Sequence, residues 1–337
     1  MAAGHVCRCR AWRVGRRRTP LQAVDRALSQ PSSPKVCAVV VTYNRKDLLL
    51  QCLEAMRAQT RRPDRILVVD NASTDGTAQA LEASGWLARP GFELLRLSEN
   101  TGGAGGFQAG VTRAFEAGAD WVWMMDDDAM PRRDALQALM AVEPDPSSLY
   151  GSVAVQGSTL AWPMERVGVR EHARIEDVAQ APAVCDVLFL PFLGLLASAA
   201  LVRRIGPPDA SLFLAVDDVE FCLRARRSGA RIHLVSASRI DHPLAHRTAV
   251  RVGWRTVYTL RLPPWKRYYD VRNRLLVARA HHGAALWYAA LPGTLLRWVV
   301  TLLTEPERGA QCRAFAGGVI DGLLNRRGRR HDIWLAS

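Results

Sequence analysis

The chain has 337 residues and a formal net charge of +13, and 49% of its residues are hydrophobic. This length is enough for one large or two modest domains. The charge is uneven: residues 1–35 carry eight Lys or Arg against one acid, residues 244–337 carry sixteen against five, and residues 36–243 carry 21 against 26. Basic ends without a helix-turn-helix, zinc-finger or RNA-recognition motif argue against nucleic acid as the partner.

Residues 1–34 are predicted to be a disordered basic tail. They are rich in Arg, Pro and Ser, and the arginines are not followed by an apolar stretch of signal-peptide length. The seven cysteines of the chain show neither a disulfide framework nor paired metal-ligand spacing. Both features predict a cytoplasmic protein in a reducing compartment.

Strands and helices are expected to alternate along the first third of the chain. The expected strands are 36–42, 66–69, 92–97 and 121–125. The expected helices are 47–59, 77–84 and 106–117. Continuous apolar runs such as VCAVVVT (36–42) are typical of strands covered on both faces. The rhythm predicts an α/β fold with a mostly parallel, doubly wound, Rossmann-like sheet, whose ligands bind at the carboxyl ends of the strands.

The pattern weakens after residue 150. The expected elements there are a strand at 184–189, helices at 194–201 and 219–228, and a strand at 232–234. From Tyr268 onward the pattern is helical and rich in Arg and Trp. The predicted organisation is therefore a main domain at 35–245 and a basic helical C-terminal region at 246–337. The main domain divides into a donor half at about 35–150 and an acceptor half at about 151–245.

Three acids, Asp126, Asp127 and Asp128, directly follow the apolar strand WVWMM (121–125). Like charges this close raise one another's pKa values unless a cation neutralises them, and carboxylate oxygens suit Mg²⁺ or Mn²⁺. Such an ion can bridge a diphosphate and offset the charge on a leaving group. The alternative is a solvated turn or the acidic start of a helix. The buried strand in front of the acids favours the metal site.

The segment NTGGAGGF (100–107) contains a run of glycines that superficially suggests a dinucleotide-binding loop. A Rossmann loop follows the first strand of its unit and is answered by an acid about 20 residues later, whereas this run precedes the helix that leads to the acidic strand. We therefore expect the glycines to let the backbone approach a nucleotide-sugar closely. A plain flexible loop is the alternative.

A second polar group comprises Asp217, Asp218 and Glu220, with His242 downstream. One of these carboxylates can deprotonate an acceptor hydroxyl if it is ionised and within reach, and a neutral imidazole can complete a metal site. The acids alone fit the first turn of a helix equally well, where the helix dipole stabilises them. His242 alone is more typical of a surface or capping histidine.

Taken together, these segments resemble the family 2 inverting glycosyltransferases of the GT-A fold. They span about two-thirds of the chain in the order of that family. The matching segments are VVVTYNR (39–45), ILVVDNASTDGT (66–77), NTGGAGGF (100–107), WMMDDDA (123–129), DDVEFCLRARRSG (217–229) and DHP (241–243).

The resemblance implies roles for individual residues. The nucleotide-sugar-binding residues would be Thr42, Asn44, Asp70, Asn100, Gly103, Asp126 and Asp127. A Mn²⁺ or Mg²⁺ ion would be held by Asp126, Asp128 and His242. Asp218 would be the catalytic base, and Asp217 and Glu220 would face the acceptor. The side chain of Asp127 is expected to point away from the metal, and its loss is expected to matter least of the three acids.

The donor and the acceptor are also suggested by resemblance. NTGGAGGF, the acidic triplet and WKRYYDVRNR (265–274) are most similar to galactofuranosyl- and rhamnosyltransferases that build bacterial cell-wall polysaccharide. The expected donor is UDP-galactofuranose or dTDP-rhamnose, and the expected acceptor is a glycan or a polyprenyl-linked glycan. Many relatives have an aromatic residue or glycine where this chain has Ala215-Val216, which leaves the acceptor open.

Two other functions fit some of the same features. A sugar nucleotidyltransferase also needs acids at a strand end, but it usually presents a Gly-rich basic loop after the first strand, where this chain has Tyr43-Asn44-Arg45. A catalytically inactive scaffold that binds glycan or lipid is the alternative of another class.

The basic C-terminal region includes an apolar stretch, Ala284 to Leu303, that is interrupted by Pro292 and Arg297. The interruptions favour an interfacial helix over a spanning one, and Trp with neighbouring Arg suits the anionic inner face of a cell membrane. Peripheral attachment there is the prediction. A helical subdomain that packs into the core is the alternative.

Overall fold

The computed structural model describes residues 33–169, 174–252 and 255–335. The predicted basic tail, residues 1–34, lies outside these ranges apart from its last two residues. The predicted boundaries at about residues 150 and 245 remain predictions.

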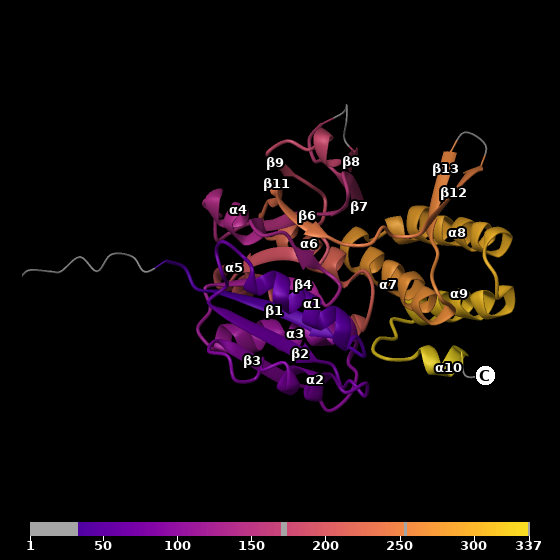
Figure 1. Ribbon diagram of the computed structural model, residues 1–337. Helices are drawn as coiled ribbons and strands as arrows, with labels where there is room; N and C mark the ends of the chain where they lie inside the picture. Colours follow the sequence, from indigo (N-terminus) through magenta and orange to yellow (C-terminus); the bar gives the residue numbers. More distant parts are fainter. Residues whose placement is uncertain (1–32, 170–173, 253–254, 336–337) are drawn as a thin grey trace, which may run out of the picture. The chain divides into compact units, whose positions relative to one another are not determined.

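All seven elements expected in the first third of the chain are present (Figure 1). They are β1 (Val36–Thr42), α1 (Lys46–Arg57), β2 (Arg65–Asp70), α2 (Thr77–Ala83), β3 (Phe92–Arg96), α3 (Gly102–Glu116) and β4 (Trp121–Asp126). The largest difference is in α3, which begins four residues before the expected helix and takes in most of the glycine run. The remaining boundaries agree to within a residue or two.

The sheet is mostly parallel in its first half. Among the described residues the strand order is β3-β2-β1-β4-β10-β6-β11-β5, and β1 to β4 all run parallel. The register pairs Thr42 with Asp70, and Val41 with Asp126. The carboxyl ends of β1, β2 and β4 therefore meet at one edge, which is where ligands bind in such sheets.

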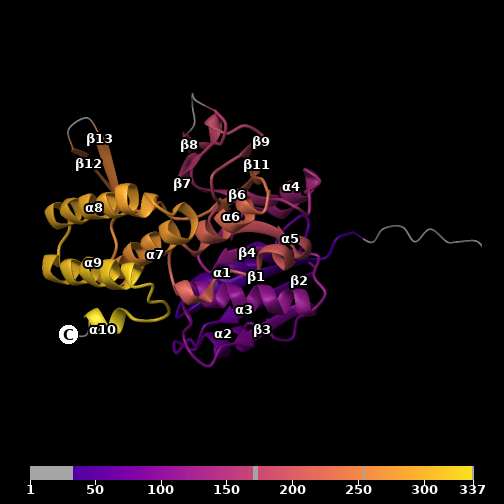
Figure 2. The ribbon, with the colours of Figure 1, turned by 180° about the vertical axis from the view of Figure 1, so that it is seen from behind.

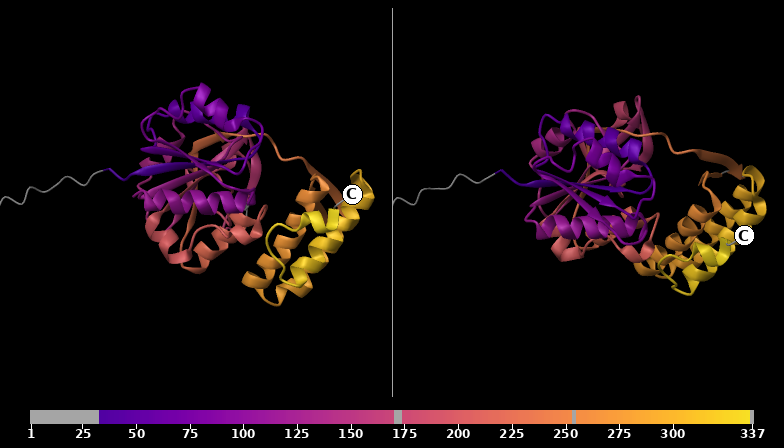
Figure 3. Two further views of the ribbon diagram at one scale, coloured as in Figure 1. Left: turned by 90° about the horizontal axis from the view of Figure 1, so that it is seen from below. Right: turned by 60° about the horizontal axis from the view of Figure 1, so that its bottom comes forward.

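The two faces of β1 bury alternate residues in two separate apolar cores. Cys37, Val39 and Val41 pack into one core with α3 and α6 (Asp217–Arg227), whereas Val36, Ala38 and Val40 pack into the other with α1 and α4 (Ala135–Ala141). Figure 3 shows helices on both sides of the sheet. This is the doubly wound arrangement that the continuous apolar runs predicted.

The second half of the sheet is richer in strands than the sequence suggested. Its further strands are β5 (Met130–Pro131), β6 (Leu149–Gln156), β7 (Thr159–Glu165), β8 (Arg174–Asp177), β9 (Val184–Asp186), β10 (Leu193–Ser198) and β11 (Ile232–Asp241). The strand expected at 184–189 keeps only its first three residues, and the one expected at 232–234 extends to Asp241. The helix expected at 219–228 is present as α6.

The prediction of a small-residue helix at 194–201 is wrong. Leu193–Ser198 forms β10, a fully buried strand that lies between β4 and β6 and runs antiparallel to both. A central strand satisfies its backbone polar groups on both sides, which outweighs helix propensity in a buried segment. The helix α5 (Ala199–Ile205) starts only afterwards, where the Ser198 hydroxyl caps it by accepting a hydrogen bond from Leu201 N at 2.9 Å.

The C-terminal region is helical from residue 264, as expected, but it opens with a hairpin that was not predicted (Figure 2). The hairpin strands are β12 (Arg247–Val252) and β13 (Arg255–Leu260). The helices are α7 (Pro264–His282), the π-helical turn η3 (Leu286–Ala290), α8 (Leu291–Thr304), α9 (Arg308–Leu323) and α10 (His331–Leu335). Helices α7 and α9 pack against each other through Gly318 and Gly322, where a Cβ would lie 2.8–2.9 Å from atoms of α7.

The interior of this region is strongly polar. Arg267 and Glu305 are each 1% exposed and form an ion pair at 2.7 Å, and the Tyr268 hydroxyl donates to Asp321 at 2.6 Å. A polar core gives a weaker periodicity than an apolar one, so the arrangement of these helices could not be derived from the sequence pattern.

Candidate functional site

A cavity of about 420 Å³ opens at the carboxyl edge of the sheet. We call it the acidic cavity, because Asp126 at the end of β4, Asp217 and Asp218 at the start of α6, and His242 after β11 all line it, together with Gly103. Five of the residues singled out in the sequence thus come together here from four separate segments.

The three acids at the end of β4 and directly after it have three different environments. Asp126 faces the cavity, and among the described residues no donor hydrogen-bonds to its carboxylate; burial, followed by Asp128 and Asp127, raises its pKa well above the ordinary value. Asp127 is buried and accepts from the Thr42 hydroxyl at 2.8 Å. Asp128 lies 3.4 Å from His242 Nε2. Asp127 thus contacts Thr42 and lies outside the cavity lining, and its expected direction away from a metal stays a prediction.

Arg45 is a part of this site that the sequence reasoning missed. Its guanidinium lies 2.8 Å from Asp128 and 3.3 Å from Asp127, so one cation of the chain itself already offsets part of the acidic charge. Burial would raise the pKa of Asp128, but His242 and Arg45 hold it below its ordinary value. The signal was present in the sequence, since Arg45 follows the first strand as the acids follow the fourth.

The chemistry of the donor atoms suits a divalent ion. His242 Nδ1 lies 2.7 Å from the Pro243 carbonyl oxygen, and in the neutral tautomer that donates from Nδ1 the unprotonated Nε2, 3.4 Å from Asp128, would be free to bind a cation. Metal-ligating histidines commonly donate their other nitrogen in this way. In the described ranges no three His, Cys, Asp or Glu side chains are already grouped as a metal site. Mg²⁺ is typically held by one or two carboxylates together with substrate phosphates, so a partial protein site fits that use.

The glycine run is a helix start, not a flexible loop. Gly102 has φ +73°, and a Cβ there would lie 1.9 Å from the Phe213 carbonyl oxygen, so only glycine fits this close approach. Asn71, which the sequence analysis did not single out, stabilises the first turn of α3. Its side chain donates to Gly102 O and accepts from Thr101 N. Asn100 accepts from Gly102 N at 2.8 Å, and Gly103 reaches the acidic cavity.

Three of the residues expected to bind the nucleotide-sugar, Thr42, Asn44 and Asp70, lie at the same edge of the sheet but outside the lining of the acidic cavity. Thr42 is 1% exposed, and the side-chain oxygen of Asn44 accepts from Thr74 N at 2.7 Å. Asp70 is fully buried; its Oδ1 accepts from Ser73 N at 2.9 Å. Its Oδ2 has no hydrogen-bond partner among the described residues, although Arg96 Nε is 3.4 Å away. Because Arg96 is largely exposed, it compensates this buried oxygen only weakly.

The acidic pair forms the first turn of α6. Burial raises the pKa of both Asp217 and Asp218, and the negative charge of Asp218 raises the pKa of Asp217 further. For Asp218 the opposing influences are the Val219 amide, which donates at 2.7 Å, and the positive charge of Arg274. Glu220 lies outside the cavity lining and is held by Arg224 at 2.8 Å. The structure therefore brings Asp217 and Asp218, but not Glu220, to the cavity.

The backbone before this pair is strained and tightly held. Phe213, Ala215 and Val216 all have φ near +66°, an uncommon conformation for residues with a Cβ. Asn273 Nδ2 donates to the carbonyls of Leu212, Leu214 and Ala215 at 2.8–2.9 Å, and it is fully buried. Asn273 belongs to the segment WKRYYDVRNR, which resembled the family in sequence but to which no function was assigned. It links the C-terminal region to the loop that presents Asp218.

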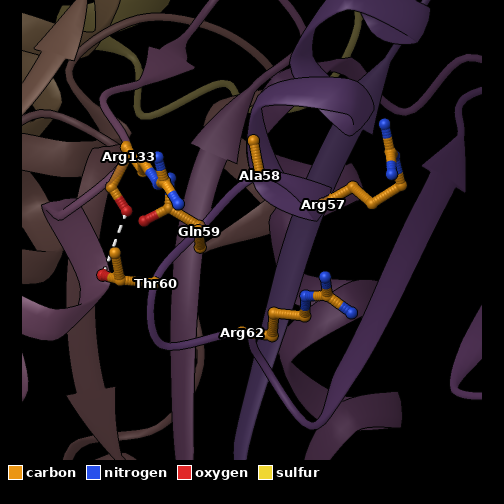
Figure 4. A pocket seen from close by; sticks show the side chains of 6 residues that line it. All are labelled: Arg57, Ala58, Gln59, Thr60, Arg62 and Arg133. Carbon is orange, nitrogen blue, oxygen red and sulfur yellow. Dashed lines mark hydrogen bonds between the residues drawn. The ribbon is translucent and has the colours of Figure 1, made fainter.

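A surface hollow of about 710 Å³, separate from the acidic cavity, lies around the C-terminal end of α1 (Figure 4). It contains none of the predicted site residues. Thr60 N donates to the Arg133 carbonyl at 2.9 Å, and the next residue, Arg61, donates to Pro34 O just before β1. This places the hollow by the start of β1, away from the carboxyl edge where the acids gather.

Comparison with known proteins identifies the family. Residues 37–167 match glycosyl transferase family 2. The galactofuranosyltransferase GlfT1 of Mycobacterium tuberculosis is 34% identical over 250 residues, covering 71% of this chain and 80% of that protein. The dTDP-rhamnosyl transferase RfbF of Shigella flexneri is 24% identical over 255 residues, covering 73% and 81%.

A solved structure supports the fold. The mannosyltransferase PcManGT of Pyrobaculum calidifontis, in complex with GDP-Man and Mn²⁺, superposes with a TM-score of 0.54 at 18% identity, covering 87% of this chain and 88% of that one. With the acidic cavity at the carboxyl edge of a GT-A sheet, and with a relative that is 34% identical over most of its length, the chain belongs to glycosyltransferase family 2 and is a glycosyltransferase.

Proposed function

We propose that the chain transfers a sugar from a nucleotide-diphosphate donor to a hydroxyl of a glycan or of a polyprenyl-linked glycan. The observation that carries the proposal is the convergence of Asp126, Asp218 and His242 on one cavity at the carboxyl edge of the sheet. Two relatives, a galactofuranosyltransferase and a dTDP-rhamnosyl transferase, support UDP-galactofuranose and dTDP-rhamnose as donors.

In the proposed reaction Asp218 is the general base. Its carboxylate takes the proton from the acceptor hydroxyl, the hydroxyl oxygen attacks the anomeric carbon, and the bond from that carbon to the nucleoside diphosphate breaks. A single displacement of this kind inverts the configuration at the anomeric carbon. Burial raises the pKa of Asp218, which brings it nearer the working pH and makes the carboxylate a stronger base, while Arg274 limits the rise.

The departing diphosphate needs positive charge. Asp126, Asp128 and His242 would hold a Mn²⁺ or Mg²⁺ ion, which when bound offsets the charge that develops on the diphosphate. Arg45, beside Asp128, adds a fixed positive charge at the same place. Asp128→Asn and His242→Ala should each weaken Mn²⁺ binding, as measured by electron paramagnetic resonance of free Mn²⁺. The exposed-surface variant Glu116→Gln, which removes the same charge elsewhere, should bind Mn²⁺ as the wild type does.

A donor panel tests the proposed function directly. UDP-, GDP- and dTDP-sugars are compared with and without Mn²⁺, first by thermal shift and then by transfer to a synthetic acceptor. One donor should raise the melting temperature, and its transfer should release a nucleoside diphosphate and give an inverted product. Release of pyrophosphate would identify a nucleotidyltransferase instead, and a product of retained configuration would contradict the single displacement.

We also propose that the enzyme works on an anionic membrane surface. By length and composition, one helix of the described residues, Leu286–Thr304, could cross a membrane, and only 22% of it is buried. Tyr288, Leu295, Val299 and Leu303 recur at intervals of seven, four and four residues, so they share one face of the helix, and they are 45–74% exposed. This exposure does not fit a helix packed into the core. An apolar face in a region with excess Arg suits the interface of anionic lipids.

Vesicle flotation tests the membrane proposal. The triple variant Leu295→Ser, Val299→Ser, Leu303→Ser should lose most of its binding to phosphatidylglycerol vesicles. Leu87→Ser, which removes a similarly exposed leucine from the sheet region, should bind like the wild type. Equal binding by the triple variant would rule out this face as the membrane contact.

A further inference from the structure

A second cavity, of about 310 Å³, adjoins the acidic cavity and has no role in the mechanism above. The two cavities have five lining residues in common: Trp162, Phe189, Leu260, Asp270 and Arg274. A molecule that presents a hydroxyl to Asp218 can therefore extend past Arg274 into the second cavity. We call it the arginine cavity for the side chains that it gathers.

Four arginines from four separate elements line the arginine cavity. They are Arg174 of β8, Arg247 of β12, Arg274 of α7 and Arg297 of α8. The acids in its lining are Glu165 and Asp270. Of the four arginines, two have carboxylate partners: Arg274 pairs with Asp270 at 2.8 Å, and Arg174 pairs with Glu176 at 2.7 Å.

The other two arginines lack such a partner. In the part of the chain that the structure describes, neither Arg247 nor Arg297 forms an ion pair; Arg297 donates to the Thr294 hydroxyl at 2.9 Å, and Arg247 lies over the Trp162 ring at 5.2 Å. Burial lowers the pKa of both, and the positive charge of Arg274 adds to the effect on Arg297, whose pKa falls to about 10. Partly buried cations without counter-charges are costly, so the cavity is suited to an anion.

The chemistry of the lining indicates which anion. Guanidinium groups match phosphate oxygens with paired N–H donors, and several of them converging from different elements are typical of phosphate recognition. The donor diphosphate already has a proposed place at the metal site of Asp126, Asp128 and His242, of which Asp126 and His242 line the other cavity. The walls of the arginine cavity are aromatic and apolar, with Trp162, Phe189 and Tyr258, and such surfaces pack well against sugar rings and hydrocarbon.

We propose that the arginine cavity binds a phosphate or diphosphate group of the acceptor, with Arg247 and Arg297 as its main contacts. This inference rests on the proposed glycosyl transfer and adds to it the chemical class of the acceptor. The phosphate end of the acceptor occupies the arginine cavity, its sugar spans the shared wall, and the attacking hydroxyl lies at Asp218.

Two synthetic acceptors with the same glycan test the proposal. One carries the glycan on a short prenyl diphosphate, and the other carries it on a neutral octyl group. The wild type should have a KM at least tenfold lower for the diphosphate acceptor. Arg247→Gln and Arg297→Gln should each raise that KM about tenfold, which corresponds to the loss of about 1.4 kcal/mol of binding, and should change the KM for the neutral acceptor less than twofold.

Controls separate this site from general charge effects and from misfolding. Arg313→Gln removes an exposed positive charge from α9 and should leave both KM values unchanged. Arg297→Lys keeps the charge without the planar fork and should fall between the wild type and Arg297→Gln. Vesicles of phosphatidylglycerol, added as a competitor, should not abolish the preference for the diphosphate acceptor.

The outcomes distinguish failure of the proposed acceptor site from failure of the proposed glycosyl transfer. Transfer to both acceptors with equal KM, or a rise in both KM values in Arg247→Gln, would overturn the anion site and leave the proposed function intact. Competition by phosphatidylglycerol that abolishes the preference would reassign the cavity to membrane headgroups and overturn the acceptor assignment. Absence of transfer to either acceptor, with any donor, would contradict the proposed function itself.

Discussion

The sheet region and the C-terminal helical region distribute polarity in opposite ways. In the sheet region, side chains such as Val39, Leu53 and Met124 are fully buried in two apolar cores. In the C-terminal region the ion pair of Arg267 and Glu305 is buried instead, while apolar side chains of α8 face outward. The first region is stabilised mainly by the hydrophobic effect, whereas the second combines buried apolar side chains such as Leu275 and Phe315 with buried ion pairs and exposes an apolar face of α8.

The two regions also contribute differently to the proposed function. The sheet region supplies Asp126, Asp218 and His242, which the proposed chemistry requires. The C-terminal region supplies arginines for the proposed acceptor site and, through Asn273, the hydrogen bonds that hold the loop before Asp218. Substitutions in the two regions should therefore differ in kind, and four of them test the contrast in order of expected size.

Arg267→Met should have the largest effect on stability. It leaves Glu305 buried and unpaired, and breaking a buried pair in this way typically costs about 3–5 kcal/mol of unfolding free energy. Urea unfolding measures the loss. The double variant Arg267→Met, Glu305→Leu removes both charges and should recover most of it. A single variant that costs under about 1 kcal/mol would mean that the polar interior is not what stabilises this region.

Leu53→Ala should cost about 2–5 kcal/mol, since Leu53 is fully buried in an apolar core and its truncation leaves a cavity. The matched control is Val299→Ala on the outward face of α8, where the side chain is 54% exposed and the change should stay within about 0.5 kcal/mol. Both are measured by urea unfolding. If Val299→Ala proved as costly as Leu53→Ala, the outward face would be packed against something in solution.

Asn273→Ala should affect both stability and catalysis. The carbonyls of Leu214 and Ala215 lose this donor, while Leu212 O keeps the Arg272 guanidinium, and the change should cost about 1–3 kcal/mol of unfolding free energy. Because Asn273 is a positioning residue for the Asp218 loop, kcat should fall at least tenfold while the KM for the donor stays within about twofold. Gln51→Ala, at an exposed position of α1, is the control. A loss of stability with unchanged kcat would limit Asn273 to a structural role.

The pH dependence of transfer should shift by the smallest amount. The rate should fall as the pH drops through the raised pKa of Asp218, because only the carboxylate accepts a proton. Arg274→Gln removes a positive charge that lowers this pKa, so the acid limb of the kcat profile should move to higher pH. Initial rates across the acid range measure the shift. A limb that stays in place, or moves to lower pH, would show that Arg274 does not act on the titrating group.

The same contrast explains how much the sequence could predict. The strands β1, β2 and β4 were predictable because each contains a continuous apolar run, whereas β3 (FELLR) fitted only the alternation of strands and helices. The sequence also singled out Asp126, Asp218 and His242, which line one cavity, and their roles stay predictions. β10 was not predictable, since the run of small and apolar residues Leu193–Ser198 fits either a helix or a buried strand. The roles of Arg45 and Asn273 depend on partners 58 to 83 residues away, which local patterns do not report.

The most direct test of the central claim compares Asp218→Asn with Asp217→Asn in sugar transfer. Both variants lose one charge from the same turn of α6, but only the first removes the proposed base. Asp218→Asn should bind the donor with wild-type affinity, as judged by thermal shift, while transfer falls by about 10² to 10⁴. Asp217→Asn should retain much more activity. Wild-type turnover by Asp218→Asn, or a larger loss in Asp217→Asn, would contradict the assignment of the base.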